Sequence, residues 1–326
     1  MVRFSWTQKQ NMGPDARADH AMTYDAARDR VVLFGGYVHV SPTKVVPVED
    51  TWEWNGAYWT QVSDIGPSAR ANHVMVYDDD REQTILFGGN TSENPGALIR
   101  AGDTWAWDGE AWTQLDDTGP PPRASAAMAF DKARRRAVLF SGDAAPNDTW
   151  EWDGDGWTQI DVSGPPRRAQ AGMTYDDLRE RVVLFGGAGG PSGRLNDTWE
   201  YDGTTWTLQA HTGPRDRAAL AIEFAGSRAI LFGGETVVNA GGQTAALGDT
   251  WEWSGRFWTQ RQDIGPAARC AHRMAYDAKR ERLVLFGGVP ASPGVTATSF
   301  FGDTWEAPIR PGDTSDPPGA PVRLAT

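Results

Sequence analysis

Three histidines stand at the same position in three copies of one repeated pattern, and their side chains could do chemistry together. His20, His73 and His272 each lie three residues after an arginine, with Asp19 beside the first and Cys270 close to the last. Imidazole nitrogens are ligands for zinc, copper and iron. Imidazole also titrates near neutral pH, which suits general acid–base catalysis. We therefore predict His20, His73, His272 and Asp19 as catalytic residues, and the three histidines as an alternative set of metal ligands.

A simpler interpretation of the three histidines is packing beneath a glycine-rich turn. No H-x-x-x-H or other close ligand spacing occurs, so a metal site would depend on how the fold directs the side chains. The remaining copies of the pattern carry Ala126, Ala171 and Leu220 at this position. We predict no cofactor, with a transition metal as the alternative.

The pattern that positions these residues returns six times along the chain. A hydrophobic run ends in F-G-G, or once in F-S-G, at Phe34, Phe87, Phe140, Phe185, Phe232 and Phe286. The motif D-T-W begins at Asp50, Asp103, Asp148, Asp197, Asp249 and Asp303. The motif W-T begins at Trp6, Trp59, Trp112, Trp157, Trp206 and Trp258, with spacings of 53, 53, 45, 49 and 52 residues. A double glycine and spaced tryptophans at a period of about 50 residues are typical of kelch-type propeller repeats.

Each repeat contains four runs of β-branched and aromatic residues separated by turn residues, which predicts four antiparallel strands. On these motifs the chain resembles the kelch-repeat family over residues 4–306. The resemblance implies an all-β fold, a six-bladed β-propeller of four-stranded antiparallel blades. The first W-T has no strands before it and the last D-T-W has none after it, so we expect residues 4–8 to complete the last blade. We assign residues 1–306 to a single propeller domain and residues 307–326 to a Pro/Gly-rich tail.

Composition limits the classes of partner. The 326 residues carry a net charge of -12 without a cluster of Lys and Arg, which argues against binding of nucleic acid or an anionic membrane. No apolar run reaches the roughly 18 residues of a membrane span. The one cysteine excludes an internal disulfide framework. Only five residues precede the first expected strand, too few for a signal peptide. We expect a soluble, cytoplasmic, monomeric protein.

Six arginines that follow the G-P turns form a second candidate: Arg17, Arg70, Arg123, Arg168, Arg217 and Arg269. In some kelch adaptor proteins, arginines at matching positions hold acidic peptides, and the resemblance implies Arg17, Arg70 and Arg269 as ligand-binding residues. The alternative interpretation is structural. The aspartate of each D-T-W is expected at the same end of the blade, where an ion pair would occupy the guanidinium.

The connections between the second and third strands break the symmetry, with 13, 13, 5, 9, 14 and 14 residues in repeats 1 to 6. The four long ones are consecutive around the ring, at the end that carries the G-P turns, which we name the long-loop rim. They are apolar for loops, which indicates packing on one another or on a partner. We predict that ligand-binding residues gather here, namely Tyr37, His39, Asn72, Glu235, Cys270, Phe300 and Phe301.

Two classes of function fit these features. The first is a binding module whose long-loop rim, over repeats 5, 6, 1 and 2, holds a small organic molecule or a protein segment. The second is an enzyme acting on a small, largely apolar metabolite in the same central pocket, with the histidines as acid–base groups or metal ligands. The chain lacks the E-x-x-x-D-x-x-x-H motif of the nitrile-specifier proteins and an obvious tyrosine partner for Cys270, as the kelch-like copper oxidases have. Fold alone does not decide between the two.

Overall fold

The computed structural model shows a chain built from β-strands. It describes residues 4–9, 12–93, 97–143, 145–189, 193–261, 263–290 and 299–309. No helix occurs within these ranges, and so none that could cross a membrane. Six four-stranded antiparallel sheets contain most of the strands, and we number them 1 to 6 by the chain order of their innermost strands. The predicted all-β class and its repeated, blade-like sheets are confirmed.

Each sheet has an innermost, a second, a third and an outermost strand. The innermost strands are β4 (Ala21–Asp25), β10 (Val74–Asp78), β14 (Ala127–Asp131), β18 (Gly172–Asp176), β22 (Ala221–Ala225) and β29 (Arg273–Asp277). The second strands are β5 (Arg30–Phe34), β11 (Gln83–Asn90), β15 (Arg136–Phe140), β19 (Arg181–Gly187), β23 (Arg228–Phe232) and β30 (Arg282–Phe286). The third strands are β8 (Thr51–Trp54), β12 (Arg100–Trp107), β16 (Thr149–Trp152), β20 (Leu195–Tyr201), β26 (Thr250–Trp253) and β31 (Thr304–Pro308). The outermost strands are β9 (Trp59–Ser63), β13 (Trp112–Asp116), β17 (Trp157–Ile160), β21 (Trp206–Ala210), β27 (Trp258–Arg261) and β2 (Thr7–Gln8).

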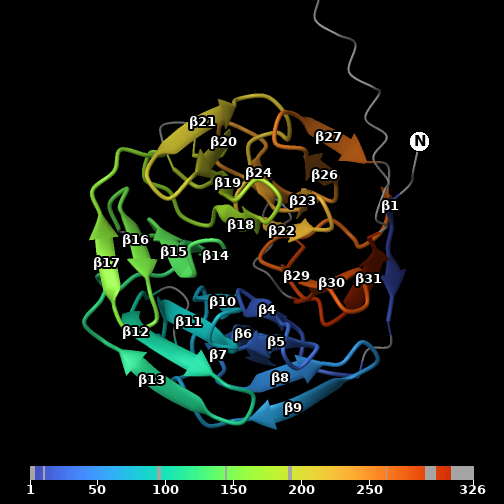
Figure 1. Cartoon of the computed structure of the whole chain (residues 1–326). Helices are drawn as coiled ribbons and strands as arrows, with labels where there is room; N and C mark the ends of the chain where they lie inside the picture. Colours follow the sequence, from blue (N-terminus) through green and yellow to red (C-terminus); the bar gives the residue numbers. More distant parts are fainter. Residues whose placement is uncertain are drawn as a thin grey trace, which may run out of the picture.

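The sheets surround a central axis, and their innermost strands face it (Figure 1). Each innermost strand contacts the one in the next sheet, and β29 contacts β4, so the contacts form a cycle. In sheet 6 the outermost strand comes from the start of the chain, where Thr7 pairs with Glu306 of β31. The predicted strand over residues 4–8 is interrupted at Trp6, whose side chain lies in the core between sheets 5 and 6. Before it, β1 (Phe4–Ser5) pairs in parallel with β28 (Asp263–Ile264).

The end of the last sheet differs slightly from the predicted domain boundary. β31 continues to Pro308, two residues beyond residue 306. The rest of the predicted tail, from residue 310 onward, lies outside the described residues.

Apolar side chains fill the spaces between neighbouring sheets. Between sheets 1 and 2, for example, Phe34 packs with Leu86 and Trp112. The Trp112 Nε1 donates a hydrogen bond of 2.9 Å to the hydroxyl of Thr51 in sheet 1. The same bond to the preceding sheet is made by Trp59, Trp157, Trp206 and Trp258. The W-T tryptophan therefore anchors each of these sheets to the one before it, as expected for a packing residue.

The double glycine is required where two sheets meet. Gly35 has a φ of 62°, and a Cβ at this position would lie 2.6 Å from the carbonyl oxygen of Arg70 in sheet 2. Gly36 has a φ of 98°, and its N–H donates to that same oxygen at 2.9 Å. We name the six arginines that follow the G-P turns the rim arginines. In every sheet, a glycine N–H donates an equivalent bond to the carbonyl oxygen of the rim arginine in the following sheet. The F-G-G motif is thus explained by the close approach of backbones.

The long connections continue the β-structure instead of forming open loops. In the first, β6 (Tyr37–Ser41) and β7 (Lys44–Pro47) pair with each other and β6 pairs with β3 (Arg17–Ala18). In the fifth, β24 (Glu235–Val237) pairs with β25 (Thr244–Ala246). In sheet 2, β11 and β12 simply extend past the double glycine. The β-branched residues that make these connections apolar also favour strand pairing. Part of the sixth connection, 291–298, lies outside the described residues.

One buried tryptophan lacks a partner that its counterparts have. The Nε1 of Trp107 donates to Glu53 in the preceding sheet, and that of Trp253 donates to Glu200. At Trp152 the corresponding residue of the preceding sheet is Ala106. The Nε1 of Trp152 is buried and has no hydrogen-bond partner.

We expect the substitution Ala106→Glu to raise the free energy of unfolding by about 1–2 kcal/mol. The new carboxylate would accept a hydrogen bond from Trp152 and lie near Arg81, as Glu53 binds Arg28 in sheet 1. Denaturant unfolding measures the change. In a Trp152→Phe background, Ala106→Glu should raise the free energy of unfolding by less. An equal gain in that background would show that the hydrogen bond from Trp152 is not its cause.

Candidate functional site

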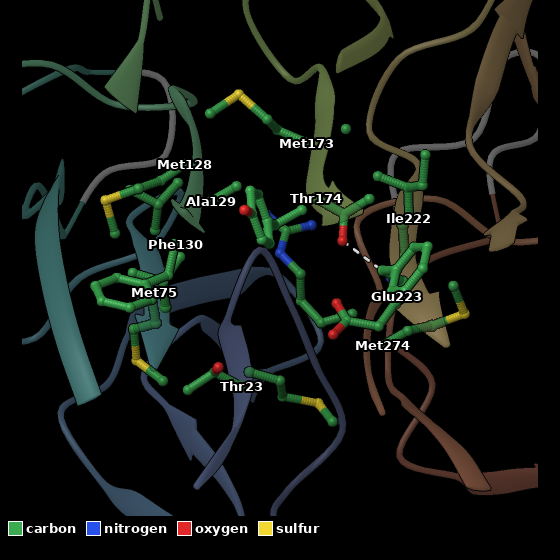
Figure 2. A pocket seen from close by; sticks show the side chains of 18 of the residues that line it. Thr23, Met75, Met128, Ala129, Phe130, Met173, Thr174, Ile222, Glu223 and Met274 are labelled. Carbon is green, nitrogen blue, oxygen red and sulfur yellow. Dashed lines mark hydrogen bonds between the residues drawn. The ribbon is translucent and has the colours of Figure 1, made fainter. Parts of the chain in front are cut away.

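The innermost strands enclose a cavity of about 490 Å³ on the central axis. Polar and apolar groups contribute about equally to its wall. The apolar part includes one position of the six innermost strands, which carries Met22, Met75, Met128, Met173, Ile222 and Met274. Figure 2 labels Met75, Met128, Met173, Ile222 and Met274 around the space. A concave space that combines apolar side chains with polar groups is the usual form of a small-molecule site. The cavity is therefore the candidate functional site.

At the end nearest the long-loop rim, six residues form a cycle of backbone hydrogen bonds, which we call the backbone ring: Asp19, Asn72, Ser125, Gln170, Ala219 and Ala271. Each N–H donates to the carbonyl oxygen of the counterpart in the preceding sheet, at 2.8–3.0 Å. All six have a φ between 52° and 57°, although none is glycine. This conformation costs roughly 1 kcal/mol per residue. Its occurrence in every sheet shows that the backbone at this position is part of the scaffold, whereas the side chains differ.

Arg273 brings a guanidinium into the cavity. At the same position the other innermost strands carry small or apolar residues, namely Ala21, Val74, Ala127, Gly172 and Ala221. Its Nη1 donates to the carbonyl oxygen of His272 at 3.0 Å, and it forms no ion pair with any described residue. Burial lowers the pKa of Arg273, against the opposing effect of the Asp19 charge. A poorly solvated cation without a carboxylate in contact favours an anion in the cavity.

Glu223 brings a carboxyl group into the same cavity. Its counterparts in the other sheets are Thr23, Val76, Ala129, Thr174 and Ala275. Figure 2 shows Glu223 in the wall with Thr174, whose hydroxyl accepts a hydrogen bond of 2.9 Å from the backbone N–H of Phe224. Burial raises the pKa of Glu223 to about 8, although the Lys132 charge and the N–H of Tyr276 act to lower it. At neutral pH the protonated carboxyl can donate a hydrogen bond.

The other end of the cavity reaches the turns between the innermost and second strands, which we name the turn end. Its lining there includes Ala26, Asp79, Lys132, Asp177, Leu178, Gly226 and Ala278. Lys132 Nζ lies 3.4 Å from Asp79 and 3.3 Å from Asp177, so it links the turns of sheets 2, 3 and 4. Lys132 also lies close enough to Glu223 to influence its pKa.

The rim arginines have their donors occupied within their own sheets. Arg17 binds both carboxylate oxygens of Asp50, at 2.7 and 2.8 Å, and its Nη1 also donates to the carbonyl of Gly35. The same bidentate pair recurs in the other five sheets, including those of Arg70 and Arg269. The ion pairs expected from the sequence are present, and they leave these buried guanidinium groups little capacity for a ligand.

The structure places the three histidines in three different interfaces between sheets. Each ring packs against a phenylalanine of the preceding sheet with centroids 5.5–5.7 Å apart: His20 on Phe286, His73 on Phe34 and His272 on Phe232. All three side chains are buried, and neither ring nitrogen has a hydrogen-bond partner. Burial is the main cause that lowers their pKa well below the usual value.

This arrangement does not bring the histidines together as a metal centre. Over the described ranges, no three His, Cys, Asp or Glu side chains are grouped so that they could hold a metal ion. The histidines are also absent from the lining of the cavity. Their position beneath the double glycines of neighbouring sheets fits the packing interpretation.

Most residues predicted at the long-loop rim do not line the cavity and contact neighbouring residues instead. Asp19 and Asn72 line it, and burial raises the pKa of Asp19 to about 6. The Tyr37 hydroxyl accepts a hydrogen bond of 2.7 Å from Asn90, and both residues are buried. The rings of His39 and Phe300 lie 4.4 Å apart.

The remaining predicted rim residues are also engaged. Phe301 lies beneath the guanidinium of Arg269 at 4.1 Å, and Glu235 forms an ion pair with Arg194. Cys270 is a buried free thiol whose pKa is raised, chiefly by burial, so it is a poor nucleophile. In the described parts of the long connections, Val40, Leu98, Ile99 and Val238 are exposed apolar side chains.

Sequence reasoning does not select Arg273, Glu223 or Lys132, although a signal for them exists. Arg273 and Glu223 are charged residues at positions where the other repeats have small, apolar or hydroxyl side chains. Lys132 is the one cation at its position among the six repeats. The same comparison between repeats that singled out the histidines would have found all three residues.

Comparison with known proteins supports the fold. No family model matches the chain. The solved structure of YjhT superposes with a TM-score of 0.69, covering 90% of this chain and 95% of that chain at 14% identity. This likeness shows a shared, propeller-like fold, and fold alone does not indicate function.

A sequence relative covers only a small part of the chain. Dynein regulatory complex subunit 7 of Chlamydomonas reinhardtii is 33% identical over 82 residues, which are 24% of this chain and 7% of that protein. Because the shared stretch is such a small part of the relative, the activity and partners of that protein indicate nothing about this chain.

We expect the buried histidines to make the protein less stable in acid. Their pKa in the folded protein lies well below the ordinary value of 6.5, so the unfolded chain takes up protons first. Above pH 6.5 the neutral histidines contribute fully to the free energy of unfolding. As the pH falls from 6.5 toward the pKa of the folded protein, this contribution is lost by up to about 1.4 kcal/mol per pH unit for each histidine.

Denaturant unfolding from pH 8 to pH 5 tests this expectation by comparing the natural protein with His73→Leu, since Leu220 is the natural residue at this position in sheet 5. The two stability curves should diverge below about pH 6.5. The exposed His211 offers a matched control, because His211→Leu should leave the curve parallel to that of the natural protein. If the stability curve of His73→Leu also runs parallel to that of the natural protein, the loss of stability in acid does not come from the buried histidine.

Proposed function

We propose that the protein is a closed, six-bladed propeller of the kelch type whose central cavity binds a small organic anion. The F-G-G, D-T-W and W-T motifs support the kelch assignment. The cyclic contacts of the innermost strands, the backbone ring and the β2–β31 pairing support closure with six blades. One observation carries the binding proposal: the guanidinium of Arg273 lines the cavity and forms no ion pair with the described residues.

The cavity also indicates what kind of anion would fit. A volume of about 490 Å³ lies in the range that holds drug-sized molecules. The methionines offer flexible, polarisable contacts to an apolar body of the ligand. Glu223 would supply a hydrogen bond at neutral pH. A compact molecule with apolar groups, one anionic group and one polar group therefore matches the wall. Docking of a protein segment on the long-loop rim remains a separate prediction.

The fluorescent probe 8-anilinonaphthalene-1-sulfonate tests this proposal, because it combines apolar rings with one sulfonate. We expect binding at one site per chain, with the affinity falling about tenfold or more in Arg273→Met. Arg273→Lys should retain part of the affinity. The matched control is Arg215→Met, which removes a surface guanidinium paired with Asp216. Failure to bind the probe, or equal affinity in Arg273→Met, would contradict the proposal.

Glu223 should make this binding depend on pH. Its pKa of about 8 keeps the carboxyl neutral below that pH, and ionisation above it adds a negative charge to the cavity. We expect the affinity for the sulfonate probe to fall severalfold between pH 7 and pH 9.5, in a step that Glu223→Gln abolishes. Fluorescence titrations at fixed ionic strength measure this. An unchanged step in Glu223→Gln would assign it to another group.

A second candidate function is acid–base catalysis in the same cavity, which the two carboxyl groups favour. Burial raises the pKa of Asp19 to about 6 and that of Glu223 to about 8, so near pH 7 one is mainly a base and the other mainly an acid. Such a pair suits proton transfer at a carbon beside a carbonyl group, with the anion of the substrate on Arg273.

Hydrogen–deuterium exchange of small 2-oxo acids, beginning with pyruvate, tests the catalytic candidate by NMR in deuterated water. The protein should accelerate exchange, and Asp19→Asn or Glu223→Gln should lower the rate about 100-fold or more. At pH 7, Glu223→Gln should still bind the sulfonate probe. Exchange that is unaffected by both substitutions would favour the binding role alone.

A further inference from the structure

We infer that ligands reach the cavity through the turn end, opposite the long-loop rim, and that Lys132 eases the passage of anions there. The inference rests on the proposed binding of an anion in the cavity. It differs from the sequence-based expectation, which placed the exposed binding surface at the long-loop rim. Three observations support it: where the lining of the cavity ends on the rim side, how the turn end is exposed, and how charge is distributed at the turn end.

Buried residues at the bases of the long connections border the rim end of the cavity. In sheets 2, 5 and 6 the residue before the ring residue is tied to the base of a long connection, in the bridges Ala71 to Asn90, Ala218 to Glu235 and Cys270 to Val289. Tyr37, Asn90, Thr236 and Cys270 at these bases are 7%, 1%, 0% and 4% exposed. None of them lines the cavity, whose lining ends at the backbone ring. The lining therefore stops at the backbone ring on this side, whereas on the other side it continues to the turns between the innermost and second strands.

The turn end, in contrast, is open to solvent. Ala26, Asp79, Asp177 and Ala278 are exposed although they line the cavity. Leu178, beside them, is 67% exposed. The turns that carry these residues are short and tight. Access from this side needs no rearrangement of strands.

Lys132 moderates the negative charge of this entrance. Asp79 and Asp177 flank it, so that removal of the lysine would leave two carboxylates facing an approaching anion. Charges at the edge of a site act mainly on the association rate and on its salt dependence. Lys132 is thus a specificity-determining residue at the entrance, whereas Arg273 binds deeper in the cavity.

Site-directed labelling tests the route. In a Cys270→Ala background, which copies the alanine of the other five repeats, a single cysteine is placed at the turn end by Ala278→Cys or at the rim by Leu98→Cys. Each protein is then coupled to a bulky polyethylene-glycol maleimide. The association rate of 8-anilinonaphthalene-1-sulfonate is measured by stopped-flow fluorescence before and after coupling. Circular dichroism verifies that each variant is folded.

We expect coupling at position 278 to slow association about tenfold or more, and coupling at position 98 to leave it unchanged. Lys132→Ala should lower the association rate severalfold at low salt, with a smaller effect at high salt. Normal association after coupling at position 278, or slowed association after coupling at position 98, overturns the inferred route and leaves the proposed function intact. Loss of probe binding in the uncoupled background would contradict the proposed function as well.

Discussion

A buried arginine–aspartate pair, repeated in each sheet, joins the three motifs that define the repeat. Arg17 donates from Nε to the carbonyl of Asp15 in the G-P turn, from Nη1 to that of Gly35 in F-G-G, and from both Nη atoms to Asp50 in D-T-W. The same aspartate accepts a bond from Trp52. Removing one partner of such a pair leaves a buried charge uncompensated, at a cost of about 3–5 kcal/mol. Each motif therefore constrains the other two, and together they fix where the innermost strand begins.

This scaffold changes which residues can be considered functional. Charges that recur in every sheet are paired, and the rim arginines belong to this group. Arg273 and Glu223 each occur once, inside the cavity, and their pKa values are displaced mainly by burial. Ionisable groups in such surroundings destabilise a fold, and they are characteristic of ligand sites. The two groups thus mark the cavity as the place where this chain departs from a simple scaffold.

The repeat pattern predicts the strands, their order and the arginine–aspartate pairs, because these depend on short-range spacing that six copies repeat. The candidate site is predicted less well. His20, His73 and His272 differ between repeats as a functional residue would, but the side chain at this strand position turns into the space between sheets. Arg273 is one residue further along and faces the axis. Which of two adjacent positions faces a cavity depends on how the sheets pack, and the spacing of motifs does not contain that information.

The outermost strand of sheet 6 links the first part of the chain to the last. Thr7 and Gln8 find their partners only in Glu306 and Trp305, whereas the other outermost strands pair with a third strand that lies a few residues away in the sequence. Contacts between such distant segments are slow to form, because a long loop must close before they contribute. During synthesis, sheets 1 to 5 can therefore assemble progressively. The core around Trp6 is completed only after β31 has been synthesised.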